Sequence, residues 1–139
     1  GGGLSLAATI NVTGADEIIG LWISRMSFMT PIVMVALIVG LVIFLTELTS
    51  NIATTATLVP VLASSAPLLF IKPDIVIVVV ALAASCAFML PVATPPNAII
   101  FATGRVSAQE MAAAGLAMNI FALVVISVVG YALIPLVLR

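Results

Sequence analysis

A polar interruption, TELTSNIATTAT at residues 46–57, separates two strongly apolar stretches of the chain. Most of its polar side chains are hydroxyls, joined by one carboxamide, Asn51, and one carboxylate, Glu47. Hydroxyl, carboxamide and backbone carbonyl oxygens suit a hard cation, whereas the free amide hydrogens at a helix start favour an anion. The sequence therefore indicates ion binding, and it offers no pairing of a nucleophile with a base that would indicate an enzyme.

The helix expected to begin near Ile52 needs an N-cap, and Ser50 and Asn51 stand where that cap is required. A second interruption, ATPPNAI at residues 93–99, repeats the arrangement, with Thr94 as the cap and Pro95 as the first helical residue. Two helix N-termini, each carrying a partial positive charge, would therefore converge on one anionic ligand.

The helices that precede the two interruptions would end near residues 46–49 and 92–93. Their last carbonyl groups lack partners within the helix and would provide a hard oxygen site suited to sodium. The alternative is that both interruptions are structural kinks whose polar groups are satisfied internally.

The composition predicts an integral membrane protein that crosses the membrane several times. Of 139 residues, 64% are hydrophobic and 6% charged, whereas a soluble domain is about one quarter charged. Broken helices persist at membrane depth only when buried in protein or lining a wet cavity, which makes a transporter the leading interpretation. The chain has no histidine and no basic stretch that would suggest nucleic acid, and its single cysteine, Cys86, is interpreted as a helix-packing residue.

We expect four all-helical segments. They are a membrane entry segment with an interfacial amphipathic helix (1–30), a helical hairpin with its tip at 46–57 (31–71), a transmembrane helix broken at 93–97 (75–103) and a C-terminal transmembrane helix (109–138). The hairpin is long enough for two full spans or for a re-entrant loop. Its tip is rich in small hydroxylated residues, and this favours the re-entrant form. The opening Gly1-Gly2-Gly3, without a preceding Met, suggests a C-terminal portion of a larger membrane protein.

Charged residues add three further expectations. Glu47, the only acid within an apolar stretch, either assists cation binding or, as we favour, has a structural role such as accepting bonds from amides. Ser107 and Glu110 have the spacing of a capping box. Loop charges would put Arg25, Lys72 and Arg139 on the cytoplasmic side and Arg105 on the opposite side.

The stretch LTELTSNIATTATLVPVLA resembles the hairpin in the second repeat of the divalent anion/sodium symporter family, the INDY-like dicarboxylate transporters, and ATPPNAI resembles the broken helix that follows it. The opening GGGLSLA is similar to the segment that enters that repeat. This resemblance covers nearly the whole chain. It implies the second of two inverted repeats in a homodimeric sodium-coupled dicarboxylate symporter that works by an elevator-type motion in the cell (inner) membrane.

The resemblance also implies roles for individual residues. Ser50 and Asn51 would contact a substrate carboxylate of a succinate-like dicarboxylate, with Thr94 and Pro95 lining the same pocket. The implied sodium ligands are Thr46, Thr49, Asn51 and Ala93. The family's hairpin enters from the external side, which opposes the charge-based orientation, and we follow the motifs. The N-terminal remainder of the transporter, with the first repeat, would complete the substrate pocket.

The chain departs from the family pattern at Ile52, where the family has Thr. The change removes a hydroxyl beside the expected carboxylate and bears on substrate preference. Two alternatives therefore stay open beside sodium–dicarboxylate symport: a proton-coupled or other-anion transporter of the same architecture, and a membrane assembly subunit without transport activity.

Overall fold

The computed structural model describes residues 12, 30–69 and 71–132. Within these residues all regular secondary structure is helical, so the predicted all-α class is confirmed. The elements are α3 (Pro31–Thr46), α4 (Asn51–Ser65), the short 3-10 helix η1 (Ala66–Leu69), α5 (Pro73–Ala84), α6 (Pro95–Ala102) and α7 (Ala108–Ala132). The interfacial helix predicted within 1–30 and the end of the last predicted helix, 133–138, lie outside the described residues.

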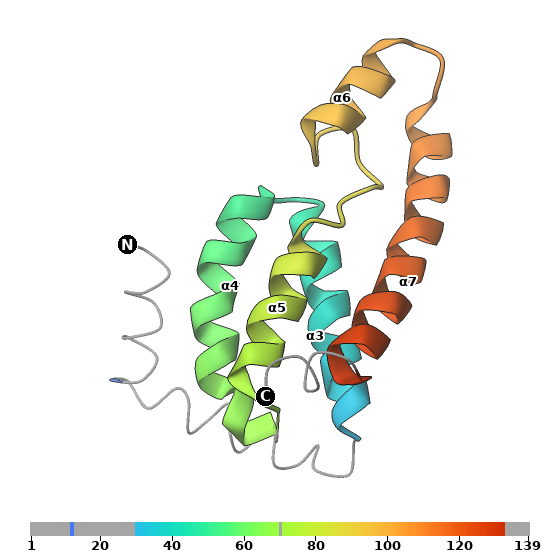
Figure 1. Ribbon diagram of the computed structural model, residues 1–139. Helices are drawn as coiled ribbons and strands as arrows, with labels where there is room; N and C mark the ends of the chain where they lie inside the picture. Colours follow the sequence, from blue (N-terminus) through green and yellow to red (C-terminus); the bar gives the residue numbers. More distant parts are fainter. Residues whose placement is uncertain (1–11, 13–29, 70, 133–139) are drawn as a thin grey trace.

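Helices α3 and α4 form an antiparallel hairpin (Figure 1). Helix α3 starts with Pro31, where the missing amide hydrogen costs nothing, and its cap at the far end is Glu47. The chain turns at residues 47–50, and Ser50 then caps α4 by accepting a hydrogen bond from the backbone nitrogen of Ala53 at 3.1 Å. The non-helical tip therefore covers only residues 47–50, and α4 begins at Asn51, one residue before its predicted start near Ile52.

Helix α5 lies at the centre of the described fold and packs against α3, α4 and α7. It runs beside all three helices in Figure 1. Five of its valines and alanines have no exposed surface: Val76, Val79, Val80, Ala83 and Ala84. Small and β-branched residues allow close approach between helices, which is how helices associate in lipid. Cys86 packs against the edge of this core, in agreement with its interpretation as a packing residue.

The polypeptide is non-helical between α5 and α6. Helix α5 ends at Ala84, so the prediction that it continues to residues 92–93 is wrong. Helix α6 starts at Pro95 and lies beyond the C-terminal end of α5 (Figure 1). A turn containing Gly104, whose φ of 68° suits glycine, then reverses the chain into α7.

Of the described helices, α7 alone is both long and apolar enough to cross a membrane. Its start is fixed by the predicted capping box: the Ser107 Oγ accepts from the Glu110 nitrogen at 3.2 Å, and Glu110 Oε2 accepts from the Ser107 nitrogen at 2.8 Å. The 16 residues of α3 rise by about 24 Å at 1.5 Å per residue. This is shorter than the hydrocarbon core of about 30 Å.

Candidate ligand-binding site

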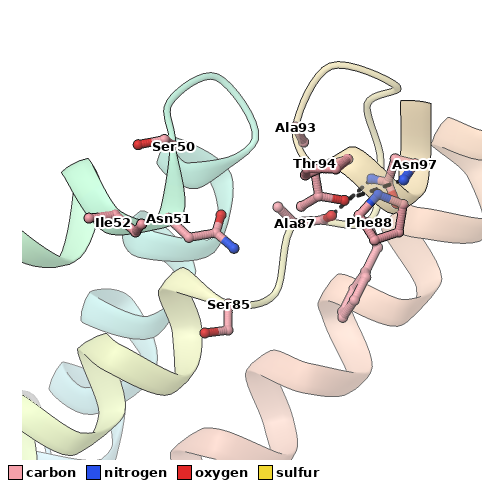
Figure 2. A pocket seen from close by; sticks show the side chains of 11 residues that line it. Ser50, Asn51, Ile52, Ser85, Ala87, Phe88, Ala93, Thr94 and Asn97 are labelled. Carbon is pink, nitrogen blue, oxygen red and sulfur yellow. Dashed lines mark hydrogen bonds between the residues drawn. The ribbon is translucent and has the colours of Figure 1, made fainter. Parts of the chain in front are cut away.

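An open pocket of about 510 Å³ lies between the hairpin tip and the chain that joins α5 to α6 (Figure 2). The N-terminal ends of α4 and α6 both line the pocket. These are the two helix starts predicted to converge on one anion. The predicted residues Ser50, Asn51, Ala93, Thr94 and Pro95 all lie in its wall. The structure therefore brings these residues together, and their contact with a ligand stays a prediction.

The α4 wall carries the hydrogen-bond donors. The first backbone amides of a helix have no hydrogen-bond partner within the helix. In α4, the Ser50 side chain accepts from the amide of Ala53. The amides of Asn51 and Ile52 therefore remain available to a ligand. The Asn51 side chain extends into the space between the two walls (Figure 2). Its Oδ1 is 2.8 Å from the Thr46 Oγ1, so its amino group is available to the pocket. This wall can therefore hold a carboxylate by direct hydrogen bonds.

The α6 wall differs, because its first two residues, Pro95 and Pro96, have no amide hydrogen. The next amide, of Asn97, is already bonded to the Thr94 Oγ1 at 3.4 Å. Thr94 caps this helix as predicted, and its hydroxyl hydrogen remains free to reach a ligand. The second helix start thus contributes its dipole and one hydroxyl, rather than a row of amides.

Two of the four predicted sodium ligands contact each other. The Thr46 Oγ1 lies 2.8 Å from Asn51 Oδ1 and 2.9 Å from the carbonyl oxygen of Ala84, and its single hydrogen serves one of them at a time. These three oxygens form a cluster of hard ligands. Thr46 is the last residue of α3 and Ala84 is the last residue of α5, at helix ends where carbonyl groups lack partners. Thr46 has no exposed surface, whereas Asn51 is partly exposed and lines the pocket, so the cluster is reached from the pocket side.

The other two predicted ligands lie outside this cluster. The Thr49 Oγ1 is 3.0 Å from the carbonyl oxygen of Leu45 and 2.6 Å from the Thr54 Oγ1. Ala93 belongs to the opposite wall of the pocket, beside Thr94 (Figure 2). A cation that contacts all four residues would have to bridge the two walls, and the donor set fits sodium, since all its groups are neutral oxygen ligands.

Glu47 is buried at the hairpin tip, with 4% of its surface exposed. Its carboxylate accepts hydrogen bonds from the backbone nitrogens of Phe88, Met89 and Leu90 at 2.9–3.2 Å. A fourth donor, Asn119 Nδ2 on α7, lies 2.7 Å away. All four of these groups are donors, so the expectation that Glu47 accepts bonds from amides in a structural role is confirmed. These bonds also explain why α5 ends early.

Sequence reasoning missed Asn97 and Ser85, which both line the pocket. The Asn97 Nδ2 donates to the carbonyl oxygens of Ala87 and Leu90, each at 3.0 Å, and so ties α6 to the non-helical chain (Figure 2). Asn97 falls within the predicted second interruption, so a search for a partner of the freed carbonyls could have found it. Ser85 gave no comparable signal, because it is surrounded by small apolar residues.

The family described as the sodium:sulfate symporter transmembrane region matches residues 1–138. The chain belongs to this family. A sodium-dependent dicarboxylate transporter, SdcS, of Staphylococcus saprophyticus is 44% identical over 138 residues, which cover 99% of this chain and 27% of the relative. SdcS of Staphylococcus aureus strain MRSA252 is 41% identical, with 99% of this chain and 26% of the relative covered.

The resemblance to the divalent anion/sodium symporters is thereby confirmed, and so is the assignment to a membrane. The proteins it resembles are named as transporters, in agreement with the prediction that the chain is not an enzyme. The chain spans about one quarter of the length of these curated relatives, as the 27% and 26% coverage indicates.

Proposed function

We propose that this chain supplies half of the binding site in a sodium-coupled symporter for succinate-like dicarboxylates. The observation that carries the proposal is the pocket between the N-terminal ends of α4 and α6, with the Thr46–Asn51 oxygen pair at its edge. An anion-binding wall and a cation-binding cluster that share one residue are what coupled binding requires. The relatives' names, sodium-dependent dicarboxylate transporters, support the same ion and substrate class.

Asn51 is the residue through which the two ligands would be coupled. Its Oδ1 faces Thr46, while its amino group is available to the pocket. A sodium ion on the oxygen would fix the orientation of the carboxamide and hold its amino group toward a substrate carboxylate. Ser50 and Thr94 would add hydroxyl donors, and Pro95 would line the pocket. Thr49 and Ala93 would complete the sodium ligands.

The helix lengths support a re-entrant hairpin in the second of two inverted repeats. Helices α3 and α4 have 16 and 15 residues, whereas a full span needs about 20. A tip that stops at mid-membrane would place the pocket near the bilayer centre, where broken helices bind substrates in secondary transporters. The N-terminal remainder of the protein would provide the other half of the pocket. A homodimer moving by an elevator mechanism in the cell (inner) membrane completes the proposal.

Of the alternatives, one is favoured by a specific observation. Ile52 is 83% exposed and stands in the pocket wall, where an apolar side chain would favour a different anion of the same transport class. Proton coupling through Glu47 lacks such support, because its carboxylate is occupied by four donor groups. Membership of a symporter family weighs against an assembly subunit without transport activity.

The first test is thermal stabilisation of the full-length protein in detergent, with sodium or choline and with or without succinate. A ligand present at a concentration of 100 times its Kd, and binding only the folded state, stabilises that state by about 2.7 kcal/mol. We expect a melting shift with sodium that succinate increases. No shift with either ligand would overturn the proposal. In a separate uptake assay, succinate transport that persists when choline replaces sodium but depends on pH would select the proton-coupled alternative.

The site assignment is tested by Asn51→Ala in the same assay. The substitution removes the shared carboxamide, so we expect the sodium shift and the added succinate shift to disappear together. Ser64→Ala is the matched control on the same helix, because the Ser64 hydroxyl is exposed and bonds only to the Val61 carbonyl oxygen, away from the pocket. A normal sodium response in Asn51→Ala would remove Asn51 from the site.

A further inference from the structure

We infer that Glu47 and Asn119 are positioning residues that join the hairpin tip to the chain between α5 and α6, so that both walls of the pocket move as one unit. The inference rests on the proposed function. Neither residue lines the pocket. Each acts through the backbone near Phe88, which does line the pocket. Both side chains are almost completely buried, with 4% of Glu47 and 1% of Asn119 exposed.

The first step is the carboxylate itself. Three consecutive backbone nitrogens, of Phe88, Met89 and Leu90, point to Glu47. Consecutive amides that converge in this way form an anion-binding concavity, and here the anion is a side chain of the hairpin tip. Glu47 follows directly after Thr46, a member of the oxygen cluster. A shift of the chain at 88–90 would therefore be transmitted to the cation-binding side of the pocket.

The second step runs through the peptide plane between Ala87 and Phe88. In a trans peptide the N–H and the C=O point in opposite directions. Glu47 holds the Phe88 N–H, so the Ala87 C=O is directed away from Glu47, where it accepts from Asn97 Nδ2 at 3.0 Å. Asn97 belongs to the first turn of α6. The carboxylate of the hairpin tip thus fixes the start of α6 through one peptide and one side chain.

The third step is the support from α7. The Asn119 Nδ2 donates to Glu47 Oε1 at 2.7 Å, so α7 also holds the carboxylate in position. Gly115 lies one turn before it on the same helix face, and a Cβ there would overlap the carbonyl group of Phe88. The backbone at 88–89 therefore rests directly on α7. Contacts of this kind orient ligand-bearing groups without touching the ligand, and their loss costs about 10- to 100-fold in metal affinity at metal sites.

The pairing is tested by exchanging its two functional groups in the full-length protein. Glu47→Gln turns an amino group toward backbone N–H donors, and Asn119→Asp places a second carboxylate against the first. The double variant Glu47→Gln/Asn119→Asp restores one carboxylate and one carboxamide with their places exchanged. We expect each single change to weaken sodium affinity by about 10- to 100-fold. The double variant should lose less than the two single losses combined, because it relieves the contact between two carboxylates, although the amino group introduced by Glu47→Gln still faces backbone N–H donors.

Sodium affinity is measured per folded molecule, beside the melting temperature without sodium. A merely structural role lowers the melting temperature and leaves sodium affinity unchanged, and that result would overturn the inference. Losses that simply add in the double variant would overturn it as well, because independent residues behave additively. If the unmodified protein itself shows no sodium response, the proposed function fails. If it responds and the folded variants respond equally, the positioning role alone fails.

Hydrogen exchange on the unmodified full-length protein decides the question even if no variant folds. As sodium is titrated, peptides from the tip at 46–52 and from the chain at 85–97 should gain protection with one common midpoint. Two separate midpoints, or protection of the tip alone, would show that the walls respond independently and would overturn the inference.

Discussion

Gly115 of α7 supports the carbonyl group of Phe88 so closely that a single added carbon atom at Gly115 would overlap it. The non-helical chain between α5 and α6 is therefore held between α7 on one side and the Glu47 carboxylate on the other. The pocket wall at Phe88 is therefore shaped by Gly115, which does not itself line the pocket. The first prediction follows from this contact.

Gly115→Ala should displace the chain at 88–89 and lower both stability and sodium affinity. Overpacking of this kind costs about 1–3 kcal/mol. Melting temperature and sodium titration of the full-length protein measure the two effects. Gly130→Ala is the matched control, because its added carbon would overlap Val79 in the helix interface rather than the pocket backbone. We expect it to lower stability only. Equal sodium affinity in the two variants would contradict the prediction.

Thr94→Ala should remove the cap of α6 together with the free hydroxyl beside the pocket. Loss of an N-cap costs about 0.5–2 kcal/mol, and substrate affinity should fall because the α6 wall loses its hydroxyl donor to the pocket. Thr94→Ser retains the hydroxyl and should retain both properties. Substrate titration at saturating sodium, beside the melting temperature, tests this. A Ser variant as weak as the Ala variant would show that the methyl group matters instead.

Ile52→Thr should strengthen dicarboxylate binding by adding a hydroxyl to the first turn of α4. A hydrogen bond to a charged group contributes about 1.5–3 kcal/mol, so a rise in succinate affinity of roughly 10- to 150-fold is expected. Ile52→Val has nearly the shape of the Thr variant without its hydroxyl and should leave affinity unchanged. Since Ile52 is 83% exposed, neither change should alter stability greatly. Competition among anions of different charge and length would reveal a switch of preference instead.

Ser107→Ala should destabilise α7 without affecting the ligands. The substitution removes the hydroxyl that accepts from the Glu110 nitrogen at 3.2 Å, at a cost of about 0.5–2 kcal/mol. Ser107 lies in the turn after α6 and does not line the pocket. We therefore expect a lower melting temperature and an unchanged sodium midpoint, with Ser107→Thr behaving like the native protein. A shifted midpoint would link this turn to the site.

The sequence was sufficient for features decided within a few residues. The caps at Ser50 and Thr94 and the capping box at Ser107 follow from local hydrogen bonding, and each is present. The two interruptions and the all-helical class followed from polar residues in apolar surroundings. Their meeting in one pocket could be expected by analogy with broken helices in transporters.

The end of α5 could not be predicted in this way. Residues 85–90 are apolar or small and contain no proline or glycine, so local propensity favours a longer helix. The amides of Phe88, Met89 and Leu90 instead bond to Glu47, more than forty residues earlier, as the separations of 41 to 43 positions show. Asn119, 72 positions from Glu47, has no sequence signal for that pairing. Such tertiary bonds are invisible to periodicity and capping rules.

The prolines at the start of α6 have a consequence for the size of the ligand. Hydrogen bonds from α4 would specify the direction of approach, whereas α6, without amide hydrogens from Pro95 and Pro96, would act mainly through its electric field, beside the single hydroxyl of Thr94. One end of a dicarboxylate would therefore be held in register, while its other end is attracted over a range of distances. A wall of this kind tolerates carbon chains of unequal length between the two carboxylates.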